Sequence, residues 1–277
     1  MHNQAHKAAL QFYLDHGVDE ALVDAPVDRT KIKAKPVAAI VASSPQAQPA
    51  TPSLSESARA QPEPLLGASD ARVEAVKLAE AANTLDELRE ASAAFDGIAI
   101  KKTATNLVFA DGNPQADVML IGEAPGADDD RQGKPFVGAS GQLLDKILAC
   151  IDLSRTEEDP FKSVYISNIL NWRPPGNRTP SPAEIEVSLP FIERHIQLVQ
   201  PKVLIFCGGV SAKALLASGD SISRLRNKWH DYKPQSLDDD AAAIAGIVTY
   251  HPAYLLQTPA QKRAVWSDML SIKEKRA

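Results

Sequence analysis

Short apolar runs and longer amphipathic segments alternate through the second half of the chain. The apolar runs, each typical of a strand buried on both faces, are residues 118–122 (VMLIG), 164–170 (VYISNIL), 203–207 (VLIFC) and 244–250 (IAGIVTY). Apolar positions at helical spacing predict helices over residues 141–151, 182–199, 211–217 and 261–275. Helices cover both faces of parallel sheets. We therefore expect an α/β fold, a three-layer α/β/α sandwich around a central, mainly parallel four-stranded sheet.

The first hundred residues have a different pattern. Residues 2–16 predict a short amphipathic helix, whereas residues 36–66 are rich in Ala, Pro, Ser and Gln and offer little apolar surface to bury. We interpret residues 1–68 as a short helix and a flexible linker, a mostly disordered N-terminal leader, and residues 69–277 as the folded domain. A docking site for a repair or replication partner is the alternative interpretation of the linker. Thr84 and Glu87 have the spacing of a capping box and predict a helix start.

Composition and charge narrow the class of protein. The chain has 277 residues and a net charge of −5, and its last 177 residues hold equal numbers of acidic and basic side chains. DNA binding is not excluded, because it depends on local patches. No run of 18 apolar residues predicts a membrane span. The two cysteines, Cys150 and Cys207, lie in apolar runs and are predicted to be buried thiols of a protein in a reducing cytoplasm.

Sites in open parallel sheets lie beyond the carboxyl ends of the strands. The first predicted strand runs into GEAPGA (residues 122–127) and then KPFVGASG (residues 134–141). Small residues let a backbone approach a ligand closely, and the second stretch opens a predicted helix whose free N–H groups suit a phosphate. A plain glycine-rich turn is the alternative. The nucleotide-binding patterns of P-loops and dinucleotide folds are absent.

Single polar side chains mark the later strand ends. Asn168 ends the second strand and offers one acceptor and two donors to a base edge, although turn capping is the commoner role of such a residue. His251 follows the fourth strand, where a structural role is again the commoner one. Arg226 and Lys228 lie in a basic segment beside Trp229, which predicts a contact with a DNA backbone or, alternatively, a solvated loop.

Taken in order, these blocks resemble one enzyme family. GEAPG, QGKPFVG, SGQLL, YISNIL, RPPGNR, KWH and YHPAYLL are similar to the motifs of family 4 uracil-DNA glycosylases, and the resemblance runs from about Thr103 to Trp266. It implies a monofunctional hydrolase that flips uracil out of single- or double-stranded DNA and cleaves its N-glycosidic bond, which starts base-excision repair. We expect a monomer in the cytoplasm, associated with the nucleoid. The alternatives are a glycosylase for hypoxanthine or xanthine and a repair scaffold that has lost catalysis.

The resemblance also implies roles for individual residues. Phe136 matches the aromatic that stacks on uracil, Asn168 the amide that binds the pyrimidine edge, and His251 the donor beside uracil O2. Ala124 stands where the best-known relatives carry Asp, so Glu123 becomes the leading carboxylate for orienting water, with Asp128 and Asp129 as alternatives. The residues implied to contact DNA are Gly138, Ser140, Arg178, Ser211 and the wedge residue Leu255, which would fill the vacated base stack.

One departure from the family concerns its iron–sulfur cluster. The four positions that correspond to the cluster cysteines hold Phe95, Ile98, Trp172 and Ser188. Because thiolates hold such clusters, we expect none here, and no other metal or cofactor. An apolar plug in place of the cluster is the predicted substitute.

Overall fold

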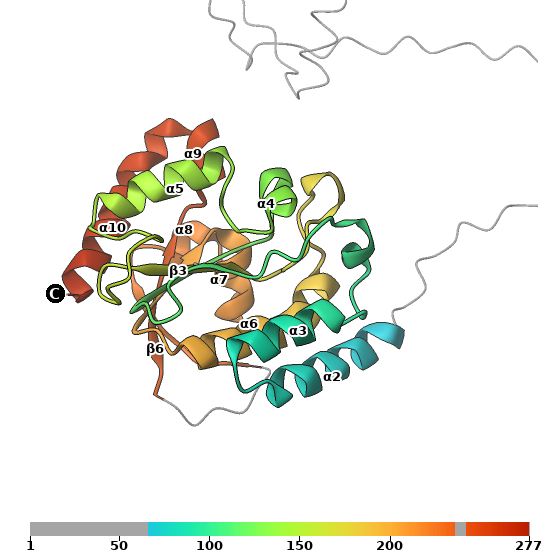
Figure 1. Ribbon diagram of the computed structural model, residues 1–277. Coiled ribbons are helices and arrows are strands. Elements are labelled where there is room, and N and C mark those ends of the chain that lie inside the picture. Colours follow the sequence, from blue (N-terminus) through green and yellow to red (C-terminus); the bar gives the residue numbers. More distant parts are fainter. Residues whose placement is uncertain (1–65, 236–241, 277) are drawn as a thin grey trace, which may run out of the picture. The chain divides into compact units, whose positions relative to one another are not determined.

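The computed structural model describes residues 66–235 and 242–276, which belong to one compact unit (Figure 1). Its centre is a six-stranded sheet in the order β1-β3-β2-β4-β6-β5. The four inner strands are parallel to one another and are β2 (Val118–Gly122), β3 (Val164–Asn168), β4 (Val203–Cys207) and β6 (Ile244–Thr249). The short edge strands β1 (Asp111–Gly112) and β5 (Trp229–Tyr232) are antiparallel to their neighbours. The expected α/β sandwich with its mainly parallel sheet is confirmed, and the edge strands are an addition to it.

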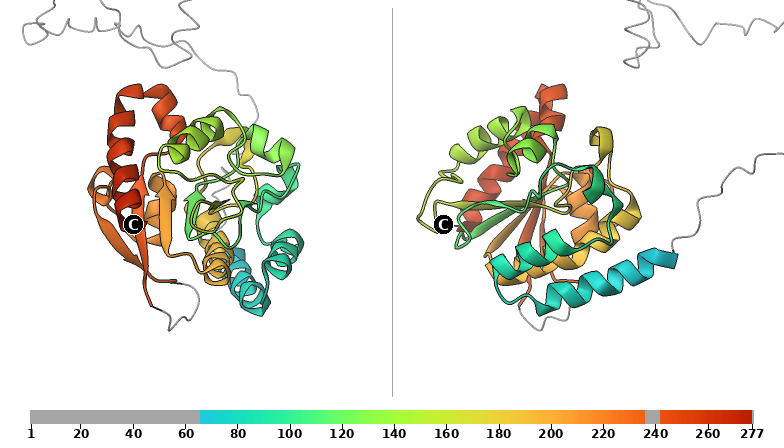
Figure 2. Two further views of the ribbon diagram at one scale, coloured as in Figure 1. Left: turned by 60° about the vertical axis from the view of Figure 1, so that its left-hand side comes forward. Right: turned by 45° about the vertical axis from the view of Figure 1, so that its right-hand side comes forward.

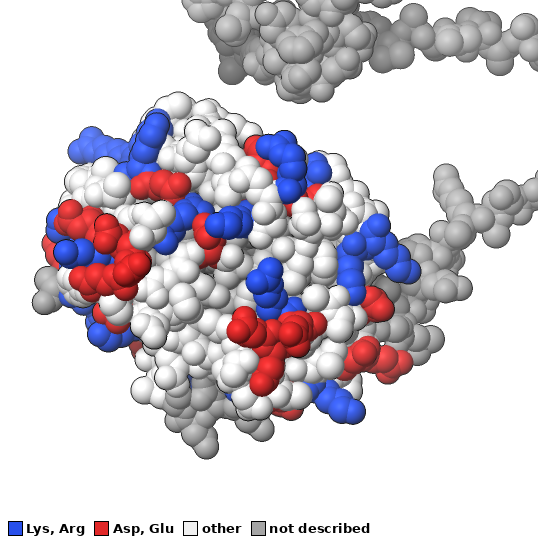
Figure 3. Space-filling view, viewed as in Figure 1, with Lys and Arg blue, Asp and Glu red and all other residues white. Residues whose placement is uncertain are grey.

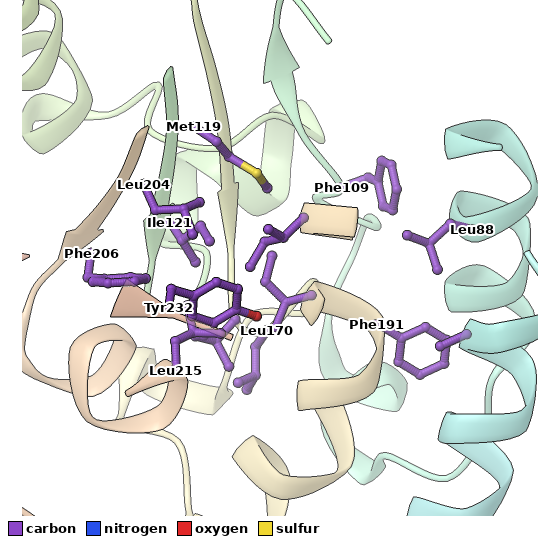
Figure 4. Packing of buried hydrophobic residues seen from close by; sticks show 14 of the residues in the cluster. Leu88, Phe109, Met119, Ile121, Leu170, Phe191, Leu204, Phe206, Leu215 and Tyr232 are labelled. Atoms are coloured by element: carbon purple, nitrogen blue, oxygen red, sulfur yellow. The ribbon is translucent and has the colours of Figure 1, made fainter. Parts of the chain in front are cut away.

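Successive residues of each inner strand enter opposite layers of the core. In β2, Val118 and Leu120 pack in one apolar cluster, whereas Met119 and Ile121 pack in the other. The second of these clusters also holds Tyr232 from the edge strand β5 (Figure 4). Because side chains alternate across a strand, an uninterrupted apolar run fills both layers at once.

Helices cover both faces of the sheet, as Figure 2 shows from two directions. One face carries α5 (Ala139–Ala149), α9 (Pro252–Gln257) and α10 (Lys262–Arg276). The other carries α2 (Leu66–Ala81), α3 (Leu85–Ala94), α6 (Pro182–Val199), α7 (Gly209–Leu215) and α8 (Ile222–Leu225). The remaining elements are the short helix α4 (Ala127–Gln132) and the 3₁₀ turns η2 (Ala99–Thr103), η3 (Pro175–Asn177) and η4 (Pro259–Gln261).

Capping explains where two of the longer helices begin. The predicted start of α3 at Thr84 is confirmed, since the Glu87 N–H donates to Thr84 Oγ1 at 3.1 Å. The Glu87 carboxylate, however, accepts the Asn83 N–H, one residue before the N–H that a capping box would use. At α6, Ser181 and Glu184 form a complete capping box, and Pro182 occupies the first helical position, where its missing N–H leaves no bond unmade.

Several sequence expectations are corrected or remain untested. Cys150, the C-cap residue of α5, is exposed rather than buried, whereas Cys207 is buried as expected. The predicted helix over residues 2–16 and the linker lie outside the described residues, and the domain boundary at residue 69 stays a prediction. Among the helices that the structure describes, none combines the length and apolarity needed to cross a bilayer.

Candidate active site

A cavity of about 440 Å³ opens at the carboxyl edge of the sheet. It is lined by four segments: the loop after β2, the turn before α5, the loop after β3, and the start of α9. The predicted site residues that line it are Glu123, Ala124, Phe136, Gly138, Ser140, Arg178 and His251. The structure therefore brings together residues that lie up to 128 positions apart in the sequence, from Glu123 to His251.

Asn168 lies at the end of β3 with a side chain that is buried and unpaired. The residue is 1% exposed, and neither Oδ1 nor Nδ2 has a hydrogen-bond partner among the described residues. Buried polar atoms are nearly always paired, so a buried amide without a partner is a candidate ligand-binding group. Gly122 on β2 supplies the space, since a Cβ there would lie 2.3 Å from Asn168 Oδ1 and 2.6 Å from the Phe136 ring.

Phe136 adopts an unusual backbone conformation beside this amide. Its φ angle is +54°, in the left-handed region that bulky residues rarely occupy and that costs about 1–3 kcal/mol. The ring is 3% exposed and stacks on the His251 ring at a centroid distance of 5.3 Å and an interplanar angle of 29°. Backbone strain of this kind persists only where surrounding contacts enforce it, and it is concentrated at functional sites.

His251 is held as a neutral imidazole. Its Nδ1 accepts the Ala253 N–H at 3.2 Å and so caps α9. Burial lowers its pKa to about 4, against a smaller opposing effect of the Asp129 carboxylate. With Nδ1 acting as an acceptor, the neutral ring carries its proton on Nε2. Gly208, at φ +103°, allows the turn after β4 to approach, because a Cβ there would lie 3.3 Å from the His251 Cβ.

The three acidic candidates have different surroundings. Burial raises the pKa of Glu123, which lines the cavity. Asp129 is occupied, since its carboxylate accepts the Gly126 N–H at 3.1 Å and the Val137 N–H at 2.8 Å. Asp128 pairs with Arg131 at 2.7 Å. Of these three carboxylates, Glu123 is therefore the best candidate to accept a proton.

The loop after β3 is fastened to the start of α6. Arg178 donates two hydrogen bonds to Glu184, at 2.8 and 2.6 Å, and the pairing lowers the pKa of Glu184 to about 2. Glu184 is also the capping residue of α6, where it accepts the Ser181 N–H at 2.8 Å. One carboxylate thus holds both the helix start and the arginine at the cavity wall.

Two of the predicted DNA contacts are buried instead. The Arg226 guanidinium is 5% exposed and forms a salt bridge with Asp268 at 2.6 Å, and Ser211 is fully buried with its hydroxyl donated to the Gly208 carbonyl. These side chains hold the fold together and do not face a ligand. Lys228, by contrast, is exposed just before β5, at the edge of the sheet where β6 ends.

The predicted wedge residue also needs correction. Leu255 is fully buried in the core between α5 and α10, and a side chain in that position cannot fill a base stack without leaving the core. Its neighbour Leu256 is 49% exposed and lines the cavity. The sequence signal for choosing between them is the periodicity of α9, a helix too short to show it.

The positions that correspond to cluster cysteines form part of an apolar core. Phe95, Ile98 and Ser188 are buried, and the Phe95 ring packs against Phe191 at a centroid distance of 5.2 Å. Trp172 packs against the same core and lies under the Lys101 ammonium at 5.9 Å. These side chains offer no thiolate and do not fit an iron–sulfur cluster. Among the described residues, no three His, Cys, Asp or Glu side chains gather in a way that would hold a metal ion.

Charges of both signs share one face of the molecule. In the view of Figure 3, Lys and Arg side chains lie among Asp and Glu side chains, and uncharged surface separates them. That face therefore carries no field of a single sign.

Fold and site together define an α/β protein with a cavity at the carboxyl edge of its sheet, where an aromatic ring lies beside an amide that has no hydrogen-bond partner among the described residues. Comparison with known proteins gives the family. The family model of the uracil DNA glycosylase superfamily matches residues 109–270, more than half of the chain, and the chain belongs to this superfamily.

Individual relatives place it further. The type-4 uracil-DNA glycosylase of Pyrobaculum aerophilum is 36% identical over 190 residues, which cover 67% of this chain and 91% of that protein. The type-4 uracil-DNA glycosylase of Archaeoglobus fulgidus is 36% identical over 179 residues, or 63% and 84%. A type-5 uracil-DNA glycosylase of Thermus thermophilus is 34% identical over 115 residues, or 38% and 52%. The similarity to the type-4 proteins is thus the more extensive.

Proposed function

We propose that this protein excises uracil from DNA by hydrolysing its N-glycosidic bond. The observation that carries the proposal is the buried, unpaired amide of Asn168 beside the Phe136 ring. The superfamily match and the names of the type-4 relatives support it. A monomer as the active form stays a prediction. A location in the cytoplasm at the nucleoid stays a prediction.

The amide of Asn168 suits uracil better than cytosine. Its Oδ1 accepts the uracil N3–H while its Nδ2 donates to O4, whereas cytosine presents a donor and an acceptor in the reverse order. A site built for one hydrogen-bonding edge rejects the other strongly, because its buried polar atoms are then left unpaired. Phe136 supplies the apolar surface on which the base stacks.

His251 stabilises the negative charge that develops on the leaving uracil. As the N-glycosidic bond breaks, negative charge grows on uracil O2, and the Nε2–H of a neutral imidazole is a suitable donor to it. Comparable donors to an oxyanion contribute about 2.7–4 kcal/mol to the transition state. The low pKa keeps the ring neutral at neutral pH, so that Nδ1 stays free to cap α9.

Glu123 orients the attacking water. It is the cavity carboxylate whose pKa is raised by burial, and a raised pKa makes a carboxylate a better proton acceptor near neutral pH. Its negative charge also stabilises the positive charge that develops on the sugar. Both Asp129 oxygens already accept a backbone N–H, which favours Glu123 over Asp129 for this role.

DNA is held at the rim of the cavity. Gly138 and Ser140 lie at the N-terminus of α5, whose free N–H groups suit a flanking phosphate, and Arg178 and Lys228 add positive charge. We assign the wedge that replaces the flipped base to Leu256, the exposed leucine at the cavity.

We further propose that the enzyme works without an iron–sulfur cluster. The apolar contacts of Phe95, Ile98 and Trp172 tie η2 and the loop after β3 to the helix layer, the same segments that a cluster would join. No catalytic step requires a metal ion, since the proton acceptor and the hydrogen-bond donor are both side chains.

The proposal is tested by strand cleavage after alkali on labelled duplexes with one U·G, one T·A or one I·T pair. We expect cleavage at uracil alone, unchanged by EDTA, from protein without stoichiometric iron. Cleavage at inosine alone would show an enzyme specific for hypoxanthine. DNA binding without strand cleavage would favour a repair scaffold. Stoichiometric iron in the active protein would contradict the proposed absence of a cluster.

A further inference from the structure

The strained peptide of Phe136 is held from three sides. Asp129 accepts the N–H of the following residue, Val137, at 2.8 Å. Gly141 presses against the peptide, since a Cβ there would lie 1.7 Å from the Phe136 carbonyl oxygen. The third restraint is Arg155, whose guanidinium donates to the Pro135 carbonyl at 2.9 Å and to the Phe136 carbonyl at 3.0 Å.

Arg155 lies outside every motif of the family resemblance, in the loop between α5 and β3. Its side chain is 11% exposed and is fixed by two carboxylates, Asp145 on α5 at 2.8 Å and Asp111 on β1 at 3.2 Å. The Arg155 side chain therefore connects α5, the edge strand β1 and the two carbonyls of the turn that carries the Phe136 ring. The fork geometry of arginine makes this possible, because its donors point in several fixed directions within one plane.

We propose that Arg155 is a positioning residue for catalysis: it fixes the peptide of Phe136 in its left-handed conformation and so orients the ring against the base. This inference rests on the proposed function, since it assigns a role in binding the base that is excised. Arg155 does not line the cavity and acts through Phe136 alone. Lysine cannot replace it, because a single ammonium cannot reach both carbonyls and both carboxylates at once.

A matched control is available on the opposite layer. Arg194 on α6 is also partly buried and also donates to a backbone carbonyl, that of Ala82, at 2.9 Å, and to Gln197 at 3.1 Å. It does not line the candidate site. Arg194→Met therefore removes two hydrogen bonds of a partly buried arginine without touching the Phe136 turn.

The test measures single-turnover rates of uracil release and inhibition by free uracil for the wild type, Arg155→Met, Arg155→Lys and Arg194→Met. We expect Arg155→Met to slow release and weaken uracil inhibition, each by about tenfold or more, with no rescue by Arg155→Lys. Arg194→Met is expected to lower the melting temperature alone. If Arg155→Met does not fold, the same two measurements are made on Arg155→Lys, which keeps the charge and is expected to show the same losses.

A double-mutant cycle separates positioning from general stability. In a Phe136→Ala background, the Arg155 substitution is expected to change the rate less than twofold, because the ring that it orients is gone. An equal loss in both backgrounds, or wild-type rates and uracil inhibition in the Arg155 variants, would overturn the inference while leaving the proposed function intact. A wild type that releases no uracil would instead overturn the proposed function, and this inference with it.

Discussion

Two neighbouring asparagines differ in the hydrogen-bond partners of their side chains. The Asn171 amide donates to the Val108 carbonyl at 3.1 Å and fastens a loop. Asn168, three residues earlier, is buried without a partner among the described residues. An unpaired buried group costs about 1–3 kcal/mol, which the uracil edge would recover in the proposed binding mode. The sequence analysis singled out Asn168 as a polar residue at a strand end, but only the contacts show that its amide lacks a partner among the described residues.

The wedge assignment leads to a prediction about two adjacent leucines. Leu256→Ala is expected to slow excision from double-stranded DNA at least severalfold more than from single-stranded DNA, because only a duplex leaves a gap in the stack. Leu255→Ala is expected to destabilise the fold by about 2–5 kcal/mol, because it opens a cavity in the core.

The two variants are compared by urea unfolding and by rates on matched single- and double-stranded substrates. If Leu255→Ala kept full stability and lost only duplex activity, the assignment of the wedge to Leu256 would be wrong.

At the scale of elements, a buried ion pair holds the end of β6. Arg226, just after α8, donates hydrogen bonds to both carboxylate oxygens of Asp268 on α10. Thr249, at the end of β6, donates to the same carboxylate at 2.8 Å. The Arg226 guanidinium also lies over the Tyr250 ring at 4.2 Å. This network fixes the strand end from which His251 follows.

Breaking this network by removing one partner leaves a buried charge uncompensated. We therefore expect Arg226→Ala to lower the free energy of unfolding by about 3–5 kcal/mol. Lys228→Ala, at an exposed position two residues on, serves as the control and is expected to leave stability unchanged and to weaken DNA binding. Reduced DNA affinity of a stable Arg226→Ala protein would restore the original interpretation of Arg226 as a DNA contact.

The elements divide into those that the sequence could predict and those that it could not. The predicted bounds of β2, β4 and α6 match the observed ones. The two strands are unambiguous because an uninterrupted apolar run fills both core layers. The start of α6 is marked by its capping box and by the proline at the first helical position. The edge strands β1 and β5 were missed, since their residues pair with one neighbour only and carry no apolar run.

The candidate site shows a similar division. Residues in the motif blocks, such as Phe136 and His251, do line one cavity, and their roles stay predictions. The burial of Arg226 was not predictable, because its partner Asp268 lies 42 positions further along the chain. Arg155 was missed for the same reason, since its bonds to the Phe136 turn exist only in the folded chain.

At the scale of the whole molecule, buried neutral histidines link stability to pH. Burial lowers the pKa of His195 to about 3 and that of His251 to about 4. The unfolded chain binds protons on these side chains below about pH 6.5, while the folded chain does not. Lowering the pH through this window therefore favours unfolding.

His195 allows this linkage to be measured away from the site. It contacts the Tyr165 hydroxyl at 3.0 Å and stacks on Phe109. In His195→Gln, which cannot take up a proton, we expect stability to fall less steeply with falling pH than in the wild type, by up to about 1.4 kcal/mol per pH unit. Urea unfolding across the acidic range measures both slopes. Parallel curves for the two proteins would show that His195 is not held neutral.

The central claim is that the protein binds and excises uracil through Asn168, which is buried beside the Phe136 ring at the cavity, with Glu123 orienting the water. The most direct measurement is the single-turnover rate of uracil release by the wild type, Asn168→Ala and Glu123→Gln, each checked for its melting temperature. We predict release by the wild type and losses of at least about 100-fold in both variants, which stay folded. Wild-type rates in Asn168→Ala would contradict the binding site, and wild-type rates in Glu123→Gln alone would contradict the role of that carboxylate.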